Sequence, residues 1–276
     1  MKYVWLLHKV ARRVLPAEWI KRLRRLAEVY SDSIWSTDSF SEHGEDRVLS
    51  ALLQRRSQQH GEAAVERGFY VDVGAFSPKQ YSNTYSFYRA GWRGISIDAT
   101  PGSMAVFDRA RPRDINIECV VSDCADELTF YTFGNPTVVN TLSPVHAAQF
   151  ERTLGVAPKT VAVRPRSLAS LLDEHLPVDQ EIDFMSVDAE THDLQVLQSN
   201  DWARYRPKLV IVEVLSSDHD DMRSSDVCAF MIAQGYAIVA WVYPNVIFER
   251  MQDANASQTS RASGWESTAG EHERVA

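Results

Sequence analysis

The feature of this chain that most constrains its fold is a recurring unit, in which a short apolar run is followed by an acidic residue and then by a helical pattern. Strands that alternate with helices form a mostly parallel sheet covered by helices on both faces. Such proteins bind ligands at the carboxyl ends of their strands, which share one edge of the sheet. We therefore expect five acids that follow these runs to lie on one rim: Asp72, Asp98, Asp123, Asp188 and Glu213.

Two segments complete the predicted domain. The runs 236–243 and 246–250 are separated by a Pro-Asn pair and predict a terminal hairpin. Near the other end, apolar residues at helical spacing predict a helix over 41–53, with Ser41 as its capping residue. A polar loop is expected over 55–67.

Two further regions carry little periodicity. Residues 134–157 form a long insertion, and their length suits a lid that covers an acceptor site and sets specificity. The acidic run 217–221 is interpreted as a solvated loop, although these residues could also bind a metal or guard the pocket.

Charge is unevenly distributed along the 276 residues, which carry a formal net charge of −8. Residues 1–30 hold eight Lys and Arg against two Glu, so the remainder carries a net charge of −14. An acidic body disfavours nucleic acid as a partner. We interpret residues 1–40 as a basic amphipathic helical segment. It either packs on the body or makes peripheral contact with an anionic membrane surface through residues 1–30.

Composition indicates a soluble, cytoplasmic protein, which in the membrane case would lie at the inner membrane surface. No run approaches the roughly 20 apolar residues that a membrane span needs, and no signal peptide is predicted. Residues 253–276 are rich in Ser, Ala, Thr and Glu and predict a disordered tail. The cysteines lack metal-ligand spacing and are expected to be reduced thiols: Cys119, Cys124 and Cys228.

Two of the five acids have the spacing of a nucleoside site. Asp72 is followed by Gly74, which would let the backbone approach a ligand closely. Asp98 follows 26 residues after Asp72, where an acid accepts hydrogen bonds from both hydroxyls of a ribose. Asp123, directly after Ser122, is placed to meet an adenine amino group. The glycine-rich dinucleotide fingerprint is absent after Gly74, so no pyrophosphate cradle is expected.

Five sequence blocks carry a family resemblance. They are SEHGED (41–46), GFYVDVGA (68–75), YSNT (81–84), GWRGISID (91–98) and IDFMSVDAE (182–190). In this order the chain resembles the FkbM family of S-adenosylmethionine-dependent methyltransferases, over about residues 40–250. The resemblance implies the class I methyltransferase fold, a Rossmann-like, mostly parallel seven-stranded sheet with helices on both faces that ends in an antiparallel hairpin. It assigns residues 41–252 to the methyltransferase domain.

The resemblance also implies S-adenosylmethionine as cofactor and assigns six residues to its binding: Asp72, Gly74, Asn83, Asp98, Ser122 and Asp123. In this assignment Asp72 and Gly74 meet the methionine part, Asp98 binds ribose, and the last two residues approach adenine. The chain departs from the family pattern at Glu42, where Gln is common, and at Thr191, where Gly is common. The second departure could alter the acceptor pocket.

Methyl transfer to a neutral hydroxyl needs a general base or a metal ion, because such a hydroxyl is a poor nucleophile. Three residues at a predicted strand-to-helix turn are the catalytic candidates: Asp188, Glu190 and His192. His192 could act as the base, because its unperturbed pKa lies near neutrality, or be an incidental turn residue. Alternatively, Asp188, Glu190 and Glu213 could hold a divalent cation, Mg²⁺ rather than Zn²⁺. Thr191 or Asp193 could simply cap the next helix.

We therefore expect an S-adenosylmethionine-dependent O-methyltransferase. Its acceptor, a hydroxyl of a sugar, glycan or glycosylated natural product, follows from the resemblance alone. Two alternatives are a nicotinamide-dependent Rossmann oxidoreductase, which Asp98 suits, and a non-catalytic membrane-surface scaffold, which the basic residues of 1–30 suggest. The oligomeric state stays open.

Overall fold

The computed structural model describes residues 38–61, 67–134, 137 and 139–251, together with Pro16, Glu18 and Trp19. The chain divides into two units, Met1–Ser39 and Phe40–Ala276, and the second holds the sheet. Apart from those three residues, the predicted basic helix lies outside the described residues, as does the predicted tail. No helix in the described part is both long and apolar enough to cross a membrane.

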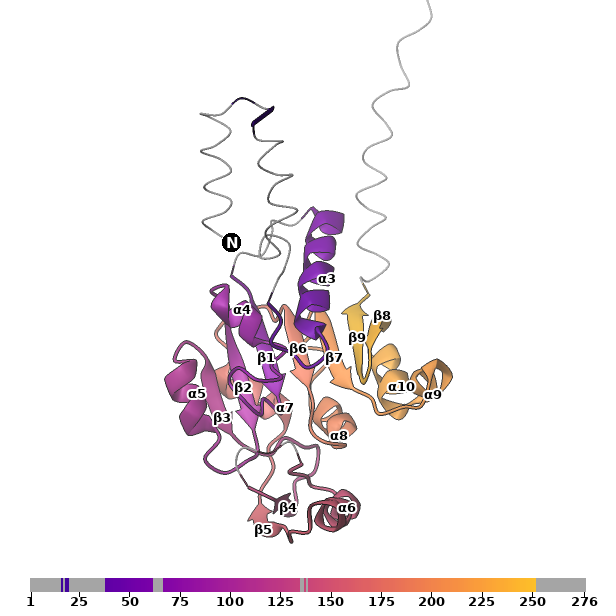
Figure 1. The fold of residues 1–276 in the computed structure, drawn as a ribbon. Helices are drawn as coiled ribbons and strands as arrows, with labels where there is room; N and C mark the ends of the chain where they lie inside the picture. Colours follow the sequence, from indigo (N-terminus) through magenta and orange to yellow (C-terminus); the bar gives the residue numbers. More distant parts are fainter. Residues whose placement is uncertain are drawn as a thin grey trace, which may run out of the picture. The chain divides into compact units, whose positions relative to one another are not determined.

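A seven-stranded sheet forms the centre of the domain, in the order β3-β2-β1-β6-β7-β9-β8 (Figure 1). The strands are β1 Phe69–Val73, β2 Arg93–Asp98, β3 Ile115–Glu118, β6 Phe184–Val187, β7 Leu209–Glu213, β8 Tyr236–Val242 and β9 Asn245–Arg250. The first five strands in this order pair in parallel, while β9 is antiparallel to both of its neighbours. The predicted mostly parallel sheet with a terminal antiparallel hairpin is confirmed.

Helices cover both faces of this sheet. They are α3 Glu45–His60, α4 Tyr85–Arg89, α5 Met104–Ala110, α7 Leu168–His175, α8 Asp193–Gln198, α9 His219–Ser224 and α10 Asp226–Ala233. Successive residues of a strand point to opposite faces. Val71 of β1 belongs to the hydrophobic cluster that contains Leu171 of α7 and Met231 of α10, whereas Tyr70 belongs to the cluster that contains Leu52 of α3 and the aromatic residues of α4. Both faces of β1 are buried, which is why its sequence is apolar almost throughout.

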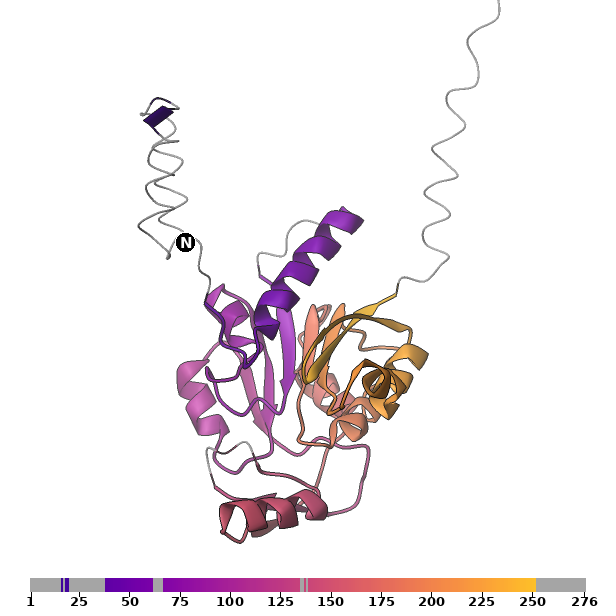
Figure 2. The same cartoon turned by 45° about the vertical axis from the view of Figure 1, so that its right-hand side comes forward.

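The insertion forms a small unit of its own at one end of the domain. β4 Leu128–Thr132 pairs antiparallel with β5 Lys159–Val163, and α6 Pro144–Leu154 lies between them in the chain. Figures 1 and 2 show this unit below the lower ends of the sheet strands, with α6 running across beneath them. The stretch 134–157 therefore contains a helix that its weak periodicity did not predict. Ser143 caps α6 by accepting a hydrogen bond from the His146 N–H, and Gly155 ends it at φ 67°.

The predicted bounds of the first helix are wrong at both ends. α3 begins four residues after Ser41, which is therefore not its N-cap. Its last turns occupy the first part of the predicted loop over 55–67, and Gly61 ends it in the left-handed conformation. Arg56 is buried in these turns and donates to Glu249 of β9 over 3.1 Å. This ion pair stabilises the last turns of α3. Because Glu249 is 193 residues away in the sequence, the local pattern around Arg56 could not predict it.

The acidic run 217–221 is exposed to solvent, as predicted, but it is not all loop, because α9 begins at His219. Asp218 is the N-cap of α9, and its carboxylate accepts hydrogen bonds from the N–H groups of Asp220 and Asp221 over 2.9 and 3.0 Å. Acids in a first turn also interact favourably with the helix dipole. These carboxylates thus stabilise the start of a helix.

Candidate active site

A cavity of about 480 Å³ opens at the carboxyl ends of the parallel strands. Its wall contains residues that follow four neighbouring strands, β2, β1, β6 and β7: Asp98, Gly74, Asp188 and Glu213. The insertion supplies the facing wall, including Phe130, Asn140 and Phe150. Three of the five predicted acids, Asp98, Asp188 and Glu213, therefore share one rim, and residues of the insertion line the same cavity.

Gly74 is essential for the way β1 and β6 end side by side. It adopts φ 79°, and a Cβ placed there would lie 1.7 Å from the carbonyl oxygen of Asp188. Its own N–H donates to the carbonyl of Ile97 over 2.9 Å. Gly74 does line the cavity, but the close approach that requires glycine is to the backbone of Asp188. This contact brings the Asp188 segment to the cavity wall.

Asp98 is held rigidly where the sequence places a ribose acceptor. One carboxylate oxygen accepts the N–H of Phe76 over 2.9 Å, and the other accepts the N–H of Thr100 over 2.7 Å. The side chain is 7% exposed and lines the cavity. A carboxylate oxygen can accept more than one hydrogen bond, so both oxygens keep capacity for ligand hydroxyls.

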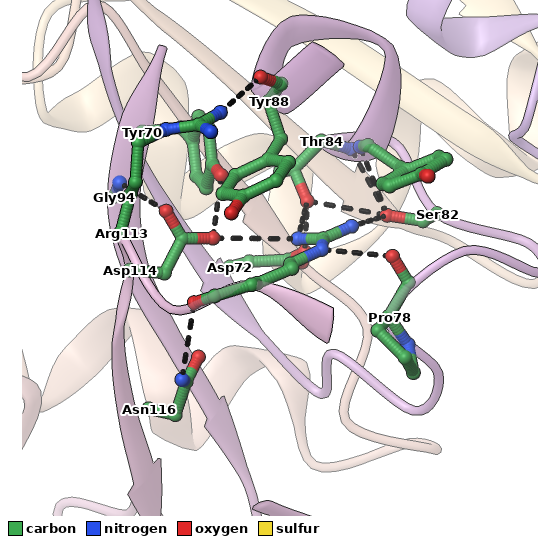
Figure 3. Close-up of polar contacts among 12 residues, drawn as sticks. Tyr70, Asp72, Pro78, Ser82, Thr84, Tyr88, Gly94, Arg113, Asp114 and Asn116 are labelled. Atoms are coloured by element: carbon green, nitrogen blue, oxygen red, sulfur yellow. Dashed lines mark hydrogen bonds and ion pairs between the residues drawn. The ribbon is translucent and has the colours of Figure 1, made fainter. Parts of the chain in front are cut away.

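Asp72 lies beneath the site rather than in its wall. Its carboxylate accepts the Thr84 hydroxyl over 2.6 Å (Figure 3), and burial raises its pKa although the Arg111 guanidinium opposes this. Asp72 therefore does not line the cavity as predicted, and its carboxylate instead holds the loop that follows β1. Asn83 of this loop does line the cavity, and its amide donates to Ser186 over 3.1 Å.

Ser122 and Asp123 also lie elsewhere than predicted. β3 ends at Glu118, earlier than the apolar run, because Ser122 donates its N–H to the carbonyl of Arg166 instead of continuing the ladder. Ser122 is buried with its hydroxyl 2.9 Å from Nε2 of His192, and Asp123 is exposed. Neither residue lines the cavity, where residues 119–121 form the wall instead. Sequence reasoning missed these three residues because it extended β3 too far.

The β6–β7 side of the cavity carries carboxylates without a basic partner in the described lining. Burial, reinforced by Glu213, raises the pKa of Asp188 to about 7. Burial and the neighbouring Asp188 raise the pKa of Glu190 to about 9. Burial and Asp193 raise the pKa of Glu213 to about 7, and Glu42, at the exposed side of the wall, adds repulsion to all three. This wall favours protons or a cationic ligand.

The predicted metal set gains no support from the arrangement. Asp188, Glu190 and Glu213 share the cavity, yet within the described ranges no three His, Cys, Asp or Glu side chains are grouped as ligands of one ion. The carboxylates of this wall are neighbours that repel one another.

A strained turn presents the predicted catalytic residues. Glu190 and Thr191 both adopt left-handed backbone conformations, at φ 50° and 76°, which cost a non-glycine residue about 1 kcal/mol or more each. The insertion braces this turn, because the Thr141 hydroxyl donates to the Glu190 carbonyl over 3.3 Å and His146 Nδ1 lies 3.3 Å from the Thr191 hydroxyl. Thr191 therefore occupies a position whose backbone favours glycine, and its side chain contacts the insertion.

His192 is a half-buried member of the wall rather than an exposed turn residue. Burial lowers its pKa, although Asp123 opposes this, so the ring is neutral at pH 7. It is the N-cap residue of α8 without a side-chain cap, while the Asp193 carboxylate accepts the Ala189 N–H over 2.8 Å and closes the turn. The site thus offers a neutral imidazole and a protonated carboxyl group near one another.

The protein is an α/β protein with a cavity at the carboxyl edge of a Rossmann-like sheet, the edge where such folds bind their ligands. The family model described as the methyltransferase FkbM domain matches residues 72–238, more than half of the chain. The chain therefore belongs to the FkbM-domain methyltransferases, and its sheet is that of a class I methyltransferase.

The search of curated proteins found no match. Among solved structures, the chain is similar to the 1,6-didemethyltoxoflavin-N1-methyltransferase of Burkholderia thailandensis with bound 1,6-didemethyltoxoflavin and S-adenosylhomocysteine. The identity is 14% and the TM-score 0.36, over 87% of this chain and 92% of that one.

Proposed function

We propose that this chain is an S-adenosylmethionine-dependent O-methyltransferase that acts on a hydroxyl of a sugar, glycan or glycosylated natural product. The observation that carries the proposal is that one cavity combines Asp98, whose carboxylate is fixed by two backbone N–H groups, with a wall of carboxylates that has no Lys or Arg in the described lining. A sulfonium cofactor needs both features, because its nucleoside is neutral and its methyl donor is cationic.

Each part of the cofactor has a matching part of the wall. Asp98 would accept the ribose hydroxyls, residues 119–121 would flank adenine, and Gly74 with Asn83 would lie near the methionine part. The β6–β7 carboxylates would face the positive charge. An incoming cation stabilises their ionised forms, so they would release protons as it binds.

When bound, the cofactor supplies an activated methyl group, and the residues of the chain orient the acceptor and handle its proton. Glu190 is our candidate general base. Its pKa is raised to about 9, which favours the protonated form at pH 7, and a nearby cation would return it to the ionised form that accepts a proton. The new carbon–oxygen bond forms as the carbon–sulfur bond breaks, and the hydroxyl proton passes to the Glu190 carboxylate. His192, neutral at pH 7, is the second candidate for this step.

The remaining wall suits a neutral, hydroxyl-rich acceptor. Phe76 and Tyr81 stack with ring centroids 6.3 Å apart, and Tyr81 is 48% exposed, which leaves an aromatic surface for the apolar face of a sugar ring. Asn140 of the insertion lines the same cavity and can hydrogen-bond hydroxyls. The described lining contains no Lys or Arg to bind an anionic acceptor.

Calorimetric titration with S-adenosylhomocysteine tests the cofactor part of this proposal. The wild-type chain should bind it, and Asp98→Asn should weaken binding by about 1–3 kcal/mol, because one acceptor of a buried hydrogen-bonded pair becomes a donor. Asp123→Asn makes the same chemical change at an exposed residue outside the wall and should leave the affinity unchanged. Absence of binding at millimolar ligand, or equal effects of the two variants, would contradict the proposal.

The membrane and scaffold hypotheses need separate experiments, because residues 1–30 lie almost wholly outside the described part of the chain. Flotation with anionic liposomes should be compared for the full chain and for a variant in which the Lys and Arg of residues 1–30 are Gln. Loss of flotation in the variant would support peripheral membrane contact, and retention would contradict it. Methyl transfer by either form would exclude a purely scaffolding role.

A further inference from the structure

A single buried guanidinium lies behind the loop that follows β1. Arg111, the residue after α5, is 0% exposed. Its Nε donates to the Pro78 carbonyl over 2.8 Å, Nη1 donates to the Thr84 hydroxyl over 2.8 Å, and Nη2 donates to the Ser82 hydroxyl over 2.7 Å. Figure 3 shows Pro78, Ser82 and Thr84 arranged around these bonds. One side chain thus contacts the loop over 76–84 at three points.

The guanidinium is itself fixed to the sheet. Nη1 lies 3.7 Å from Oδ2 of Asp114, which also accepts the hydroxyl of Tyr70 over 2.6 Å. The other oxygen of Asp114 accepts the N–H of Gly94 over 2.9 Å. Asp72 joins the network through the Thr84 hydroxyl. Because β1 and β2 supply these partners, the network ties the loop to the two strands that carry the nucleoside side of the cavity.

The loop held in this way contains two strained residues. Phe76 and Tyr81 adopt φ 49° and 55°, which is unfavourable for residues other than glycine. Both line the cavity, as does Asn83. Strained conformations persist only where the surrounding structure fixes them. The contacts of Arg111 fall at Pro78, between the two strained residues, and at Ser82, directly after the second.

Net stability alone is a weak reason to bury an arginine with carboxylates, because desolvation offsets most of the attraction within such groups. A planar guanidinium can, however, satisfy several acceptors in a fixed geometry, which a lysine ammonium cannot reproduce. The three acceptors here all belong to one loop.

We propose that Arg111 is a positioning residue of the cofactor site. Its guanidinium holds residues 76–84 in the conformation in which Phe76, Tyr81 and Asn83 line the cavity. Only the cofactor-affinity part of the test below rests on the proposed function, since the order of the loop can be measured without any ligand.

The first measurement is tryptic cleavage after Lys79, an exposed residue within the loop, followed by mass spectrometry. Arg111→Lys keeps the charge beside Asp72 and Asp114 but loses the forked geometry, so cleavage should accelerate by about tenfold or more as the loop opens. Arg113→Lys is the matched control. Arg113 stacks on Tyr88 at 3.8 Å and donates to its carbonyl, and among the described residues it makes no hydrogen bond to the loop over 76–84, so cleavage should stay at the wild-type rate. Equal rates in all three folded proteins would overturn the proposal.

A milder pair of variants covers the case in which Arg111→Lys does not fold. Ser82→Ala removes the acceptor of Nη2, together with the acceptor of the Thr84 and Tyr85 N–H groups, and cleavage after Lys79 should accelerate about threefold. Ser96→Ala removes an equally buried hydroxyl that has no hydrogen-bond partner among the described residues, and it should change nothing. A wild-type rate in Ser82→Ala would likewise overturn the proposal.

The second measurement links the loop to the site. In Arg111→Lys the Kd for S-adenosylhomocysteine should rise about tenfold or more, while kcat at saturating cofactor changes much less, because the residue touches no reacting atom. Unchanged affinity together with faster cleavage would show that the loop does not serve the cofactor. If the wild-type chain binds no S-adenosylhomocysteine, the proposed function fails, and the cleavage rates still decide the role of Arg111.

Discussion

The carboxylates at the strand ends are stabilised in different ways in the two halves of the rim, the half formed by β1 and β2 and the half formed by β6 and β7. In the half formed by β1 and β2, Asp98 accepts two backbone N–H groups, and Asp72 accepts the Thr84 hydroxyl with Arg111 nearby. In the half formed by β6 and β7, the carboxylates are half-buried in one cavity wall, and the described cavity lining gives them no Lys or Arg. The pKa is raised to about 7 or higher in each of them: Asp188, Glu190 and Glu213.

This difference indicates separate tasks. The first half is complete without a ligand, so it can act as a rigid anchor for a neutral nucleoside. The second half lacks a counter-charge, so it gains most from a cationic ligand and can exchange protons when one binds. The strained turn at Glu190 and Thr191 lies in this second half, where the chemistry would occur.

The largest effect is expected at the proposed general base. Glu190→Gln should lower kcat by about 10²- to 10⁴-fold, because the amide cannot accept the hydroxyl proton. The measurement is S-adenosylhomocysteine release with an acceptor identified by mass spectrometry from a glycan library. His192→Asn serves as the comparison and should lower kcat less. If the Asn variant loses activity and the Gln variant keeps it, the proton passes to His192 instead.

The two halves meet where Gly74 after β1 contacts the backbone of Asp188 after β6, and a substitution at Gly74 should disrupt this contact. Gly74→Ala should destabilise the fold by about 3 kcal/mol or more, because the added Cβ meets the Asp188 carbonyl at 1.7 Å in a left-handed conformation. Gly91→Ala is the matched control, since Gly91 has φ 102° but nothing within 4 Å of its Cβ, and it should lose only about 1–2 kcal/mol. Chemical denaturation measures both. Equal losses would mean that the contact with Asp188 is unimportant.

The positive charge of the cofactor should affect binding through the β6–β7 half of the rim and not through the β1–β2 half. S-adenosylmethionine carries a sulfonium that S-adenosylhomocysteine lacks, so only its binding should depend strongly on ionisation of the β6–β7 carboxylates. Between pH 6 and pH 8 the affinity for S-adenosylmethionine should rise relative to that for S-adenosylhomocysteine, by at most about tenfold per pH unit for each linked proton. Calorimetry at several pH values measures the ratio. A ratio that does not vary with pH would argue against a cation-seeking wall.

The free energy of unfolding should also depend on pH because of the β6–β7 carboxylates. The carboxylates with raised pKa values favour their protonated forms in the folded protein, whereas unfolded Asp and Glu ionise near pH 4. Their stabilising contribution is therefore complete below about pH 4 and is lost as the pH rises through 7 to 9. Glu213→Gln should reduce this loss between pH 5.5 and pH 8.5 by on the order of 1 kcal/mol. Chemical denaturation at several pH values gives the free energy of unfolding of both proteins. An equal decrease in this free energy between pH 5.5 and pH 8.5 for variant and wild type would contradict this prediction.

The smallest effect is expected from metal removal. Because the described residues contain no three-ligand group, we expect EDTA to change activity less than about twofold. Dialysis against EDTA, followed by addition of MgCl₂, tests this. Loss of activity that Mg²⁺ restores would show that the carboxylate wall closes around a cation.

The sheet and most of the rim could be predicted because each strand carries its own local signal. The runs that form β1, β2, β6 and β7 are apolar and end beside acids, so Asp98, Asp188 and Glu213 reach the cavity as expected. α6 also had a readable signal, a Ser-Pro start at 143–144 and a glycine at 155, which its weak apolar pattern concealed.

The predicted residues that do not line the cavity are held by contacts between distant parts of the chain. Asp72 was attributed to the cofactor, because nothing local shows that Thr84 and Arg111 close over it. Ser122 contacts His192 from 70 residues away, and that pairing is set by where the chain leaves β3. Hydrophobic periodicity and helix-capping residues are local signals, so they cannot predict side-chain contacts between separate elements.

The most direct test of the central claim is a crystal structure of the full chain with S-adenosylhomocysteine. The account predicts both ribose hydroxyls within hydrogen-bond distance of Asp98 and the sulfur turned toward the Glu190 side of the cavity. A nucleoside bound away from Asp98, or a sulfur that faces away from the β6–β7 carboxylates, would contradict it.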